Sequence, residues 1–138
     1  MPDDRVITIE TPVIVEDAEA MMEAQVAAIP AQSRVVILAI NDAAALGALS
    51  AFEKANRLTE VVATGQNADR VGRATLRRHD LPFVGSTSYA PEHYGEQLLD
   101  LAVRILDGEP APPAVFTRHT FITRENIDDY YPEAGERA

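Results

Sequence analysis

Apolar residues follow two patterns that alternate along the chain. Short runs rich in β-branched or other apolar residues lie at positions 5–11, 35–40, 60–64 and 81–87, and they predict β-strands. Between and after them, apolar residues recur at helical spacing, which predicts helices at about residues 17–29, 43–55, 68–78 and 91–106. Residues 35–40 are apolar at every position, which is typical of a strand that is covered on both faces in a parallel sheet.

The strict alternation of strands and helices predicts the fold class. A β-α-β-α order favours an α/β domain with an open, mostly parallel sheet, helices on both faces and right-handed crossovers. The C-terminal part has a different character, because residues 108–113 contain Pro110, Pro112 and Pro113 and form a stiff connector. Residues 114–123 are expected to be extended, residues 125–131 to form a short turn, and residues 132–138 to fray.

Composition narrows the classes of function. The 138 residues suffice for one domain, and 22 acidic against 12 basic residues give a net charge of -10. This charge repels phosphate backbones and anionic membranes, so no nucleic-acid partner is expected. The absence of cysteine excludes disulfides and thiol nucleophiles, and His79, His93 and His119 are too far apart in the sequence to predict a metal site. The apolar runs are too short for a membrane span, and residues 1–4 show no signal peptide.

Polar side chains follow the predicted strands at the points where the strands end. In open α/β sheets, ligands bind outside the carboxyl ends of the strands, where such loops converge. Amide and hydroxyl groups suit a neutral, hydroxyl-rich ligand better than a phosphate. The candidate ligand-binding residues are Asn41, Asp42, Gln66, Asn67, Ser88 and Tyr89.

Each of these loops also has a structural interpretation. Asp42 is suited to cap the following helix, so we expect Asn41 to be the residue that faces a ligand. Gln66 and Asn67 could form only a turn and a cap, and Tyr89 could be a rim aromatic.

Motifs of catalysis are absent. The sequence contains no Gly-x-Gly-x-x-Gly, no phosphate loop of the Gly-x-x-x-x-Gly-Lys type and no Gly-x-Ser-x-Gly elbow. Ser86 and Ser88 have no evident histidine partner, and His93 is expected to be solvated. We therefore expect neither an enzyme nor a bound cofactor.

Several longer stretches resemble a known family. "AINDAAALGALSAFEKANR", a following "GQN", "PFVGSTSYAPEHYGEQLLDLAVRILDGE" and "FITRENIDDYYP" resemble the C-terminal half of type 1 periplasmic sugar-binding proteins, the receptors of ABC importers. The resemblance implies one of two α/β lobes that close on a pentose or hexose. It places this lobe at residues 1–89. Residues 90–131 would then be a helix and tail that pack on or cross to the missing N-terminal lobe.

The resemblance also implies partners and residue roles. The parent protein would be periplasmic or extracellular and membrane-anchored, and would deliver sugar to the membrane subunits of an ABC transporter. Asn41 would bind sugar hydroxyls, and Asn67 would stand where the family often has a carboxylate. A neutral amide contributes roughly 0.5–1.5 kcal/mol per hydrogen bond where a carboxylate contributes roughly 1.5–3 kcal/mol. Tyr89 also departs from the family pattern.

Without the other lobe, the helix at residues 91–106 would be exposed. Its apolar side chains at Leu98, Leu101, Ala102 and Ile105 would lie in water, so we expect a homodimer or a swapped helix.

Other functions remain open from the sequence alone. The effector domain of the lactose-repressor family has the same fold, although no helix-turn-helix is present and the ending "ITRENIDDYYP" resembles the transport receptors. A stand-alone interaction domain of flavodoxin-like architecture, or an enzyme of that shape, is a further alternative.

Overall fold

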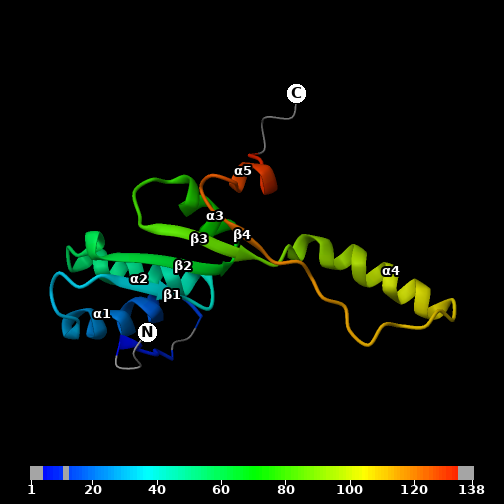
Figure 1. Cartoon of the computed structure of the whole chain (residues 1–138), viewed down its shortest axis with the longest axis horizontal. Coiled ribbons are helices and arrows are strands. Elements are labelled where there is room, and N and C mark those ends of the chain that lie inside the picture. The colour runs from blue at the N-terminus through cyan, green and yellow to red at the C-terminus, as the bar shows by residue number, and fades with distance from the viewer. Residues whose placement is uncertain (1–4, 11–12, 134–138) are drawn as a thin grey trace.

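The computed structural model describes residues 5–10 and 13–133, and its helices and strands are arranged around one β-sheet (Figure 1). The described residues form four strands in the spatial order β1 (Val35–Leu38), β2 (Val61–Asn67), β3 (Phe83–Ser88) and β4 (Thr120–Ile122). β1, β2 and β3 are parallel, and β4 is antiparallel to β3. The predicted α/β class with an open, mostly parallel sheet is confirmed.

Helices follow the strands close to where the sequence predicts them. In the described residues they are α1 (Val15–Ala28), α2 (Asp42–Lys54), α3 (Arg70–Arg77), α4 (Tyr94–Leu106) and α5 (Ile127–Tyr130), with single 3-10 turns η2 (Leu58–Glu60) and η3 (Pro91–His93). α1 begins earlier than expected, after Ile14, which offers no side-chain cap.

The core lies on one face of the sheet. Phe52 and Leu49 of α2 and Phe83 of β3 are fully buried there, together with Leu76 of α3 and Ile122 of β4. On the opposite face of β1, Val36 is 64% exposed and Leu38 is 80% exposed. The sequence predicts that both faces of this strand are covered, but among the described residues only one face of β1 is covered.

The predicted strand at residues 5–11 is wrong for its described part. Residues 5–10 form no ladder with β1, and Val6 and Ile7 are each 59% exposed. A cavity separates this segment from β1, so the two backbones cannot pair despite the β-branched sequence. Position 11 lies outside the described residues.

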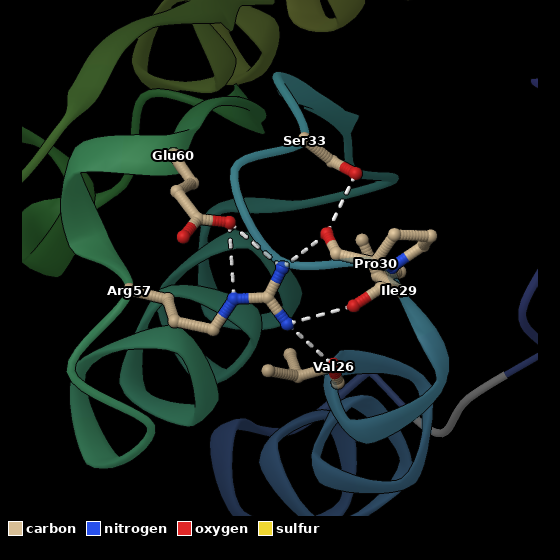
Figure 2. Close-up of polar contacts among 6 residues, drawn as sticks. All are labelled: Val26, Ile29, Pro30, Ser33, Arg57 and Glu60. Carbon is tan, nitrogen blue, oxygen red and sulfur yellow. Dashed lines mark hydrogen bonds and ion pairs between the residues drawn. The ribbon is translucent and has the colours of Figure 1, made fainter.

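A guanidinium group joins α1 to the end of α2. The Arg57 side chain donates to the carbonyl oxygens of Val26 (2.7 Å), Ile29 (2.9 Å) and Pro30 (2.8 Å), and it pairs with Glu60 (2.7 Å), as Figure 2 shows. Carbonyls at a helix C-terminus lack intrahelical partners, and Arg57 satisfies that of Val26 in the last turn of α1 and that of Ile29 just past it. This contact fixes α1 against α2 and the turn that leads into β1.

α4 extends away from the sheet, and the chain returns beside it toward β4 (Figure 1). None of the residues of α4, all of which are described, is buried. Leu98 is 65% exposed and Ile105 is 48% exposed, as the sequence predicts, and Ala102 is exposed as well. Leu101 differs, because it is half-buried.

Candidate functional site

The loops that follow β1, β2 and β3 meet at the carboxyl edge of the sheet. The Ala39 N–H donates to Thr64 O of β2 (3.0 Å), and the Gln66 amide contacts Ala39 O at 3.5 Å. The Tyr89 hydroxyl donates to the Gln66 amide oxygen. Contacts between these loops thus bring the predicted positions to a single edge.

Asn41 caps α2. Its Oδ1 accepts from the Ala44 N–H (2.7 Å), and its Nδ2 donates to Val13 O (3.1 Å). The sequence-based assignment of the cap to Asp42 is therefore wrong, because the helix begins one residue earlier than that assignment requires. Asn41 is half-buried, and both ends of its amide are engaged within the protein.

Asp42 lies inside the loop cluster with no exposed surface. Its Oδ1 accepts from the Ser86 hydroxyl (2.5 Å), and its Oδ2 accepts from the Asp69 N–H (2.8 Å). Gly65 and Gly72 line this position, where a Cβ on either would overlap the Asp42 carboxylate. Asp42 therefore connects all three loops and cannot face a ligand, which corrects its predicted role.

Burial also changes the titration of Asp42. Desolvation raises the pKa of the Asp42 carboxyl, and the hydrogen bonds from Ser86 and from the Asp69 amide oppose this shift. Ser86 in addition accepts from the Ala68 N–H (2.9 Å), so one hydroxyl serves two buried partners.

The turn after β2 presents an amide to solvent. Asn67 (φ 98°) and Ala68 (φ 47°) are both left-handed, a conformation that non-glycine residues adopt at a cost. The Asn67 side chain is exposed, and within the described part of the chain it makes no hydrogen bond. The fixed contacts of Asp42, Ser86 and Ala68 hold the strained turn in place.

The third loop supplies an aromatic ring, Tyr89, whose hydroxyl donates to Gln66. Tyr89 is half-buried, and its ring packs edge-on against His119 with centroids 4.6 Å apart. Ser88 is only 3% exposed, and its Oγ lies 2.5 Å from the Tyr131 hydroxyl. Its hydroxyl is thus engaged inside the protein.

Sequence reasoning missed His119 and Tyr131 among the residues that shape this edge, and it missed the bond between Ser86 and Asp42. Ser86 is 44 positions from Asp42, and Tyr131 is 43 positions from Ser88. No local motif signals contacts over such separations. Only the antiparallel pairing of β4 with β3 carries the C-terminal residues to this edge.

The chemistry of this edge is that of neutral hydrogen bonding. Asn67 offers a free amide, and Gln66 and Tyr89 add an amide and a hydroxyl. In the described ranges, His, Asp and Glu form no cluster able to hold a metal ion. A cavity of about 910 Å³ reaches the carboxyl end of β1, where Ala39, Ile40 and Ala44 line part of it.

Among the described residues, none of the helices combines the length and apolar character that a bilayer span requires.

Solved structures share this fold. An ABC transporter solute-binding protein from Agrobacterium vitis with bound allitol superposes with a TM-score of 0.78 at 21% identity, over 91% of this chain and 43% of that one. A periplasmic solute-binding protein of an ABC transporter from Actinobacillus succinogenes with bound D-allose gives 0.74 at 17% identity, over 85% and 40%. A protein from Mycobacterium smegmatis in complex with β-D-fucofuranose gives 0.70 at 27% identity, over 86% and 38%.

The chain spans about two fifths of the length of these structures. No curated protein matches it. A family model described as a periplasmic binding protein domain matches residues 6–110, which is most of the chain. Together with the parallel sheet and its polar carboxyl edge, this match shows that the chain belongs to the periplasmic binding protein domain family.

Proposed function

We propose that the chain forms part of the substrate-binding component of an ABC-type sugar importer and catalyses no reaction. Family membership and the sugars or sugar alcohol bound to the solved relatives support this function. The observation that carries it is the exposed, free Asn67 amide at the carboxyl edge of the sheet, next in the chain to Gln66, whose side chain accepts from Tyr89.

The ligand class follows from the groups at this edge. Neutral amides and a phenol recognise hydroxyl groups without requiring a charge on the ligand, so a pentose or hexose fits them better than a phosphate or an amino acid. Asn67, Gln66 and Tyr89 are the proposed contact residues. Gln66 bonds Ala39 and Tyr89, and Asn41 and Ser88 of the same edge are engaged as well, so a ligand could bind these three residues only after their present hydrogen bonds rearrange.

Affinity for the isolated chain should be weak. An open edge supplies contacts from one side of the ligand, while the entropic cost of capturing that ligand is undiminished. We expect Kd values of about 1 mM or weaker for the best sugar. The longer parent protein would close a second lobe over the ligand and deliver it to transporter membrane subunits. It would work in the periplasm, or outside the cell as a membrane-anchored protein.

An NMR titration tests this proposal. The chain is titrated with D-allose, D-glucose, D-ribose and allitol, with glucose 6-phosphate and L-leucine as ligands of other classes. Shifts should concentrate at Gln66, Asn67 and Tyr89 for one neutral sugar or sugar alcohol. Asn67→Leu should raise Kd about fivefold, because it removes a hydrogen bond worth about 1 kcal/mol.

The matched control is Asn56→Leu. Asn56 is also exposed and left-handed (φ 57°), but it follows the C-terminus of α2, away from the proposed site. Its replacement should leave Kd unchanged. Shifts that spread over the whole chain, or binding of L-leucine in preference to every sugar, would refute the sugar assignment.

The exposed face of α4 supports a second part of the proposal, a homodimer of the isolated chain. Leu98 and Leu99 are 65% and 67% exposed, and Leu106 is 85% exposed. Apolar surface of this extent is normally covered, and a two-fold pairing of α4 would cover it.

Sedimentation distinguishes a dimer from a monomer. The chain should sediment as a dimer at micromolar concentration, and Leu98→Glu should convert it to a monomer. Gln97→Glu adds the same charge at the neighbouring exposed position and should leave the dimer intact. A monomeric wild-type chain would refute the dimer and leave the sugar proposal standing.

A further inference from the structure

The segment that follows β4 is fixed to the sheet and leads to Tyr131. β4 pairs with β3, and Ile127 of α5 is buried in the core. Between them, the Asn126 side chain accepts from the Thr123 N–H (2.8 Å) and donates to Phe121 O (3.0 Å). Tyr131 follows directly after α5, so its place relative to β3 is set by these contacts.

Tyr131 is held by two arginines of α3. The Arg73 guanidinium carbon lies over the Tyr131 ring, 4.2 Å from its centroid, which is a cation–π distance. Arg77 donates to Tyr131 O and to Asp128 Oδ1 (2.8 Å). The Tyr131 N–H donates to Ile127 O (2.7 Å). The ring and backbone of Tyr131 are thus positioned by contacts that do not involve its hydroxyl group.

The Tyr131 hydroxyl reaches the end of β3. It lies 2.5 Å from Ser88 Oγ, and Ser88 is only 3% exposed. The same Ser88 oxygen accepts from the Ala90 N–H (3.0 Å). A hydrogen bond with Tyr131 restricts the rotation of the Ser88 hydroxyl and therefore orients the oxygen lone pair that Ala90 uses.

Ala90 needs this support because its backbone is strained. It is left-handed (φ 49°, ψ 54°), a conformation that non-glycine residues adopt at a cost. It also precedes Pro91, and a residue before proline favours extended backbone. Tyr89 lies between Ser88 and Ala90, so the turn that these two residues form sets the direction of the Tyr89 side chain. The Tyr89 hydroxyl in turn donates to the Gln66 amide oxygen.

The second loop uses the same arrangement. Ser86 of β3 accepts from the N–H of the left-handed Ala68 and donates to the buried Asp42. Ser88 occupies the equivalent place in the third loop, with Tyr131 as its partner. Two alternate residues of β3 thus each hold one left-handed alanine, and each is itself held by a residue from a distant part of the chain.

We propose that Tyr131 is a positioning residue of the sugar site at the carboxyl edge. Through Ser88 it holds the left-handed turn at Ala90 and thereby keeps the Tyr89 hydroxyl directed at Gln66. The importance of Tyr89 for a ligand rests on the proposed function, whereas the link from Tyr131 to Tyr89 does not. Tyr131 therefore acts on the ligand without touching it.

NMR spectroscopy of Tyr131→Phe tests the proposal on the full chain. The substitution removes the hydroxyl and leaves the ring in place over Arg73. Hydrogen exchange of the Ala90 amide should become about fivefold faster, because one hydrogen bond of its support is lost, while the Tyr131 amide should exchange at an unchanged rate. The resonances of the Gln66 side-chain amide should shift. Kd for the best sugar should rise about threefold.

Tyr130→Phe is the matched control. It removes the same hydroxyl group from the neighbouring tyrosine, which is 54% exposed, and should change neither the exchange rates nor Kd. Ser88→Ala removes the connecting hydroxyl. In the Ser88→Ala background, Tyr131→Phe should have no further effect, because residues that act through one contact are not additive. A tyrosine that only stabilised the chain would keep its full effect there.

Three results would overturn the proposal. The first is a Tyr131→Phe protein whose Ala90 exchange rate and Gln66 resonances match those of the wild type. The second is an effect of Tyr131→Phe that persists in full in the Ser88→Ala background. The third is an unchanged Kd although the Ala90 turn has loosened. If no sugar binds to the wild type, the proposed function fails, and the exchange rates and resonances still decide whether Tyr131 positions Tyr89.

Discussion

Ser86→Ala tests the physical basis of the loop cluster at the carboxyl edge. Ser86 is fully buried, and its hydroxyl donates to Asp42 Oδ1 (2.5 Å) and accepts from the Ala68 N–H (2.9 Å). The substitution removes one oxygen atom and leaves both partners buried. The space it vacates is small, so the loss of hydrogen bonds should dominate over the loss of packing.

The expected loss of stability follows from the two groups that Ser86→Ala leaves without this hydroxyl, the Asp42 carboxylate and the Ala68 N–H. A hydrogen bond to a charged carboxylate contributes about 1.5–3 kcal/mol, and an unsatisfied buried N–H costs about 1–3 kcal/mol. Together they predict a decrease of about 3–5 kcal/mol in the free energy of unfolding at pH 7, allowing for partial relaxation. That is a large share of the roughly 5–15 kcal/mol that a domain of this kind possesses.

Urea unfolding followed by circular dichroism measures the change. Ser33→Ala is the matched control, because the Ser33 hydroxyl also donates one hydrogen bond, to Pro30 O (2.7 Å), but in an exposed turn. It should alter the free energy of unfolding by less than about 0.5 kcal/mol.

The cost of Ser86→Ala should also depend on pH. Ser86 opposes the burial that raises the pKa of Asp42, so its removal raises that pKa further. At acidic pH, Asp42 is neutral and tolerates the loss. As the pH rises toward 7, the buried carboxylate must ionise with only the Asp69 N–H as its partner, so the variant loses more stability than the wild type. Equal costs for Ser86→Ala and Ser33→Ala, or a cost independent of pH, would show that this reasoning is wrong.

Two further substitutions test the same structure. Burial raises the folded-state pKa of Asp42 above the ordinary value of 3.8, so the stability of the wild type relative to Asp42→Asn should decline as the pH rises through and above that value. Urea unfolding at several pH values measures this difference. A difference that does not change with pH would contradict the burial of this carboxyl. Arg57→Lys keeps the charge but loses the planar guanidinium that binds the carbonyls of Val26 and Ile29, and it should lower the free energy of unfolding by about 2 kcal/mol. Arg78→Lys is the control, because the Arg78 side chain is 65% exposed in its ion pair with Asp80, and it should have almost no effect.

Local patterns determined the elements of this protein. The unbroken apolar run that contains β1 and the helical periodicity of α2 depend on neighbours within a few positions, so the sequence predicted both and their parallel arrangement. The polar loops at strand ends followed in the same way, because the carboxyl ends of parallel strands meet at one edge.

The roles of side chains within those loops needed the tertiary structure. The sequence predicted a cap at Asp42 and a ligand contact at Asn41, since both types suit either task. The structure reverses the cap, because Ser86 of β3 and the Asp69 amide at the start of α3 bind Asp42 inside the protein. Contacts made over such separations leave no local trace.

The same distinction explains residues 5–10. By itself, the sequence determined that this segment favours an extended conformation, since β-branched residues do so wherever they lie. Whether it joins a sheet depends on a strand at hydrogen-bonding distance, and only the tertiary structure decided that none is present there. Backbone pairing is a property of two segments in space, so it cannot be read from one of them.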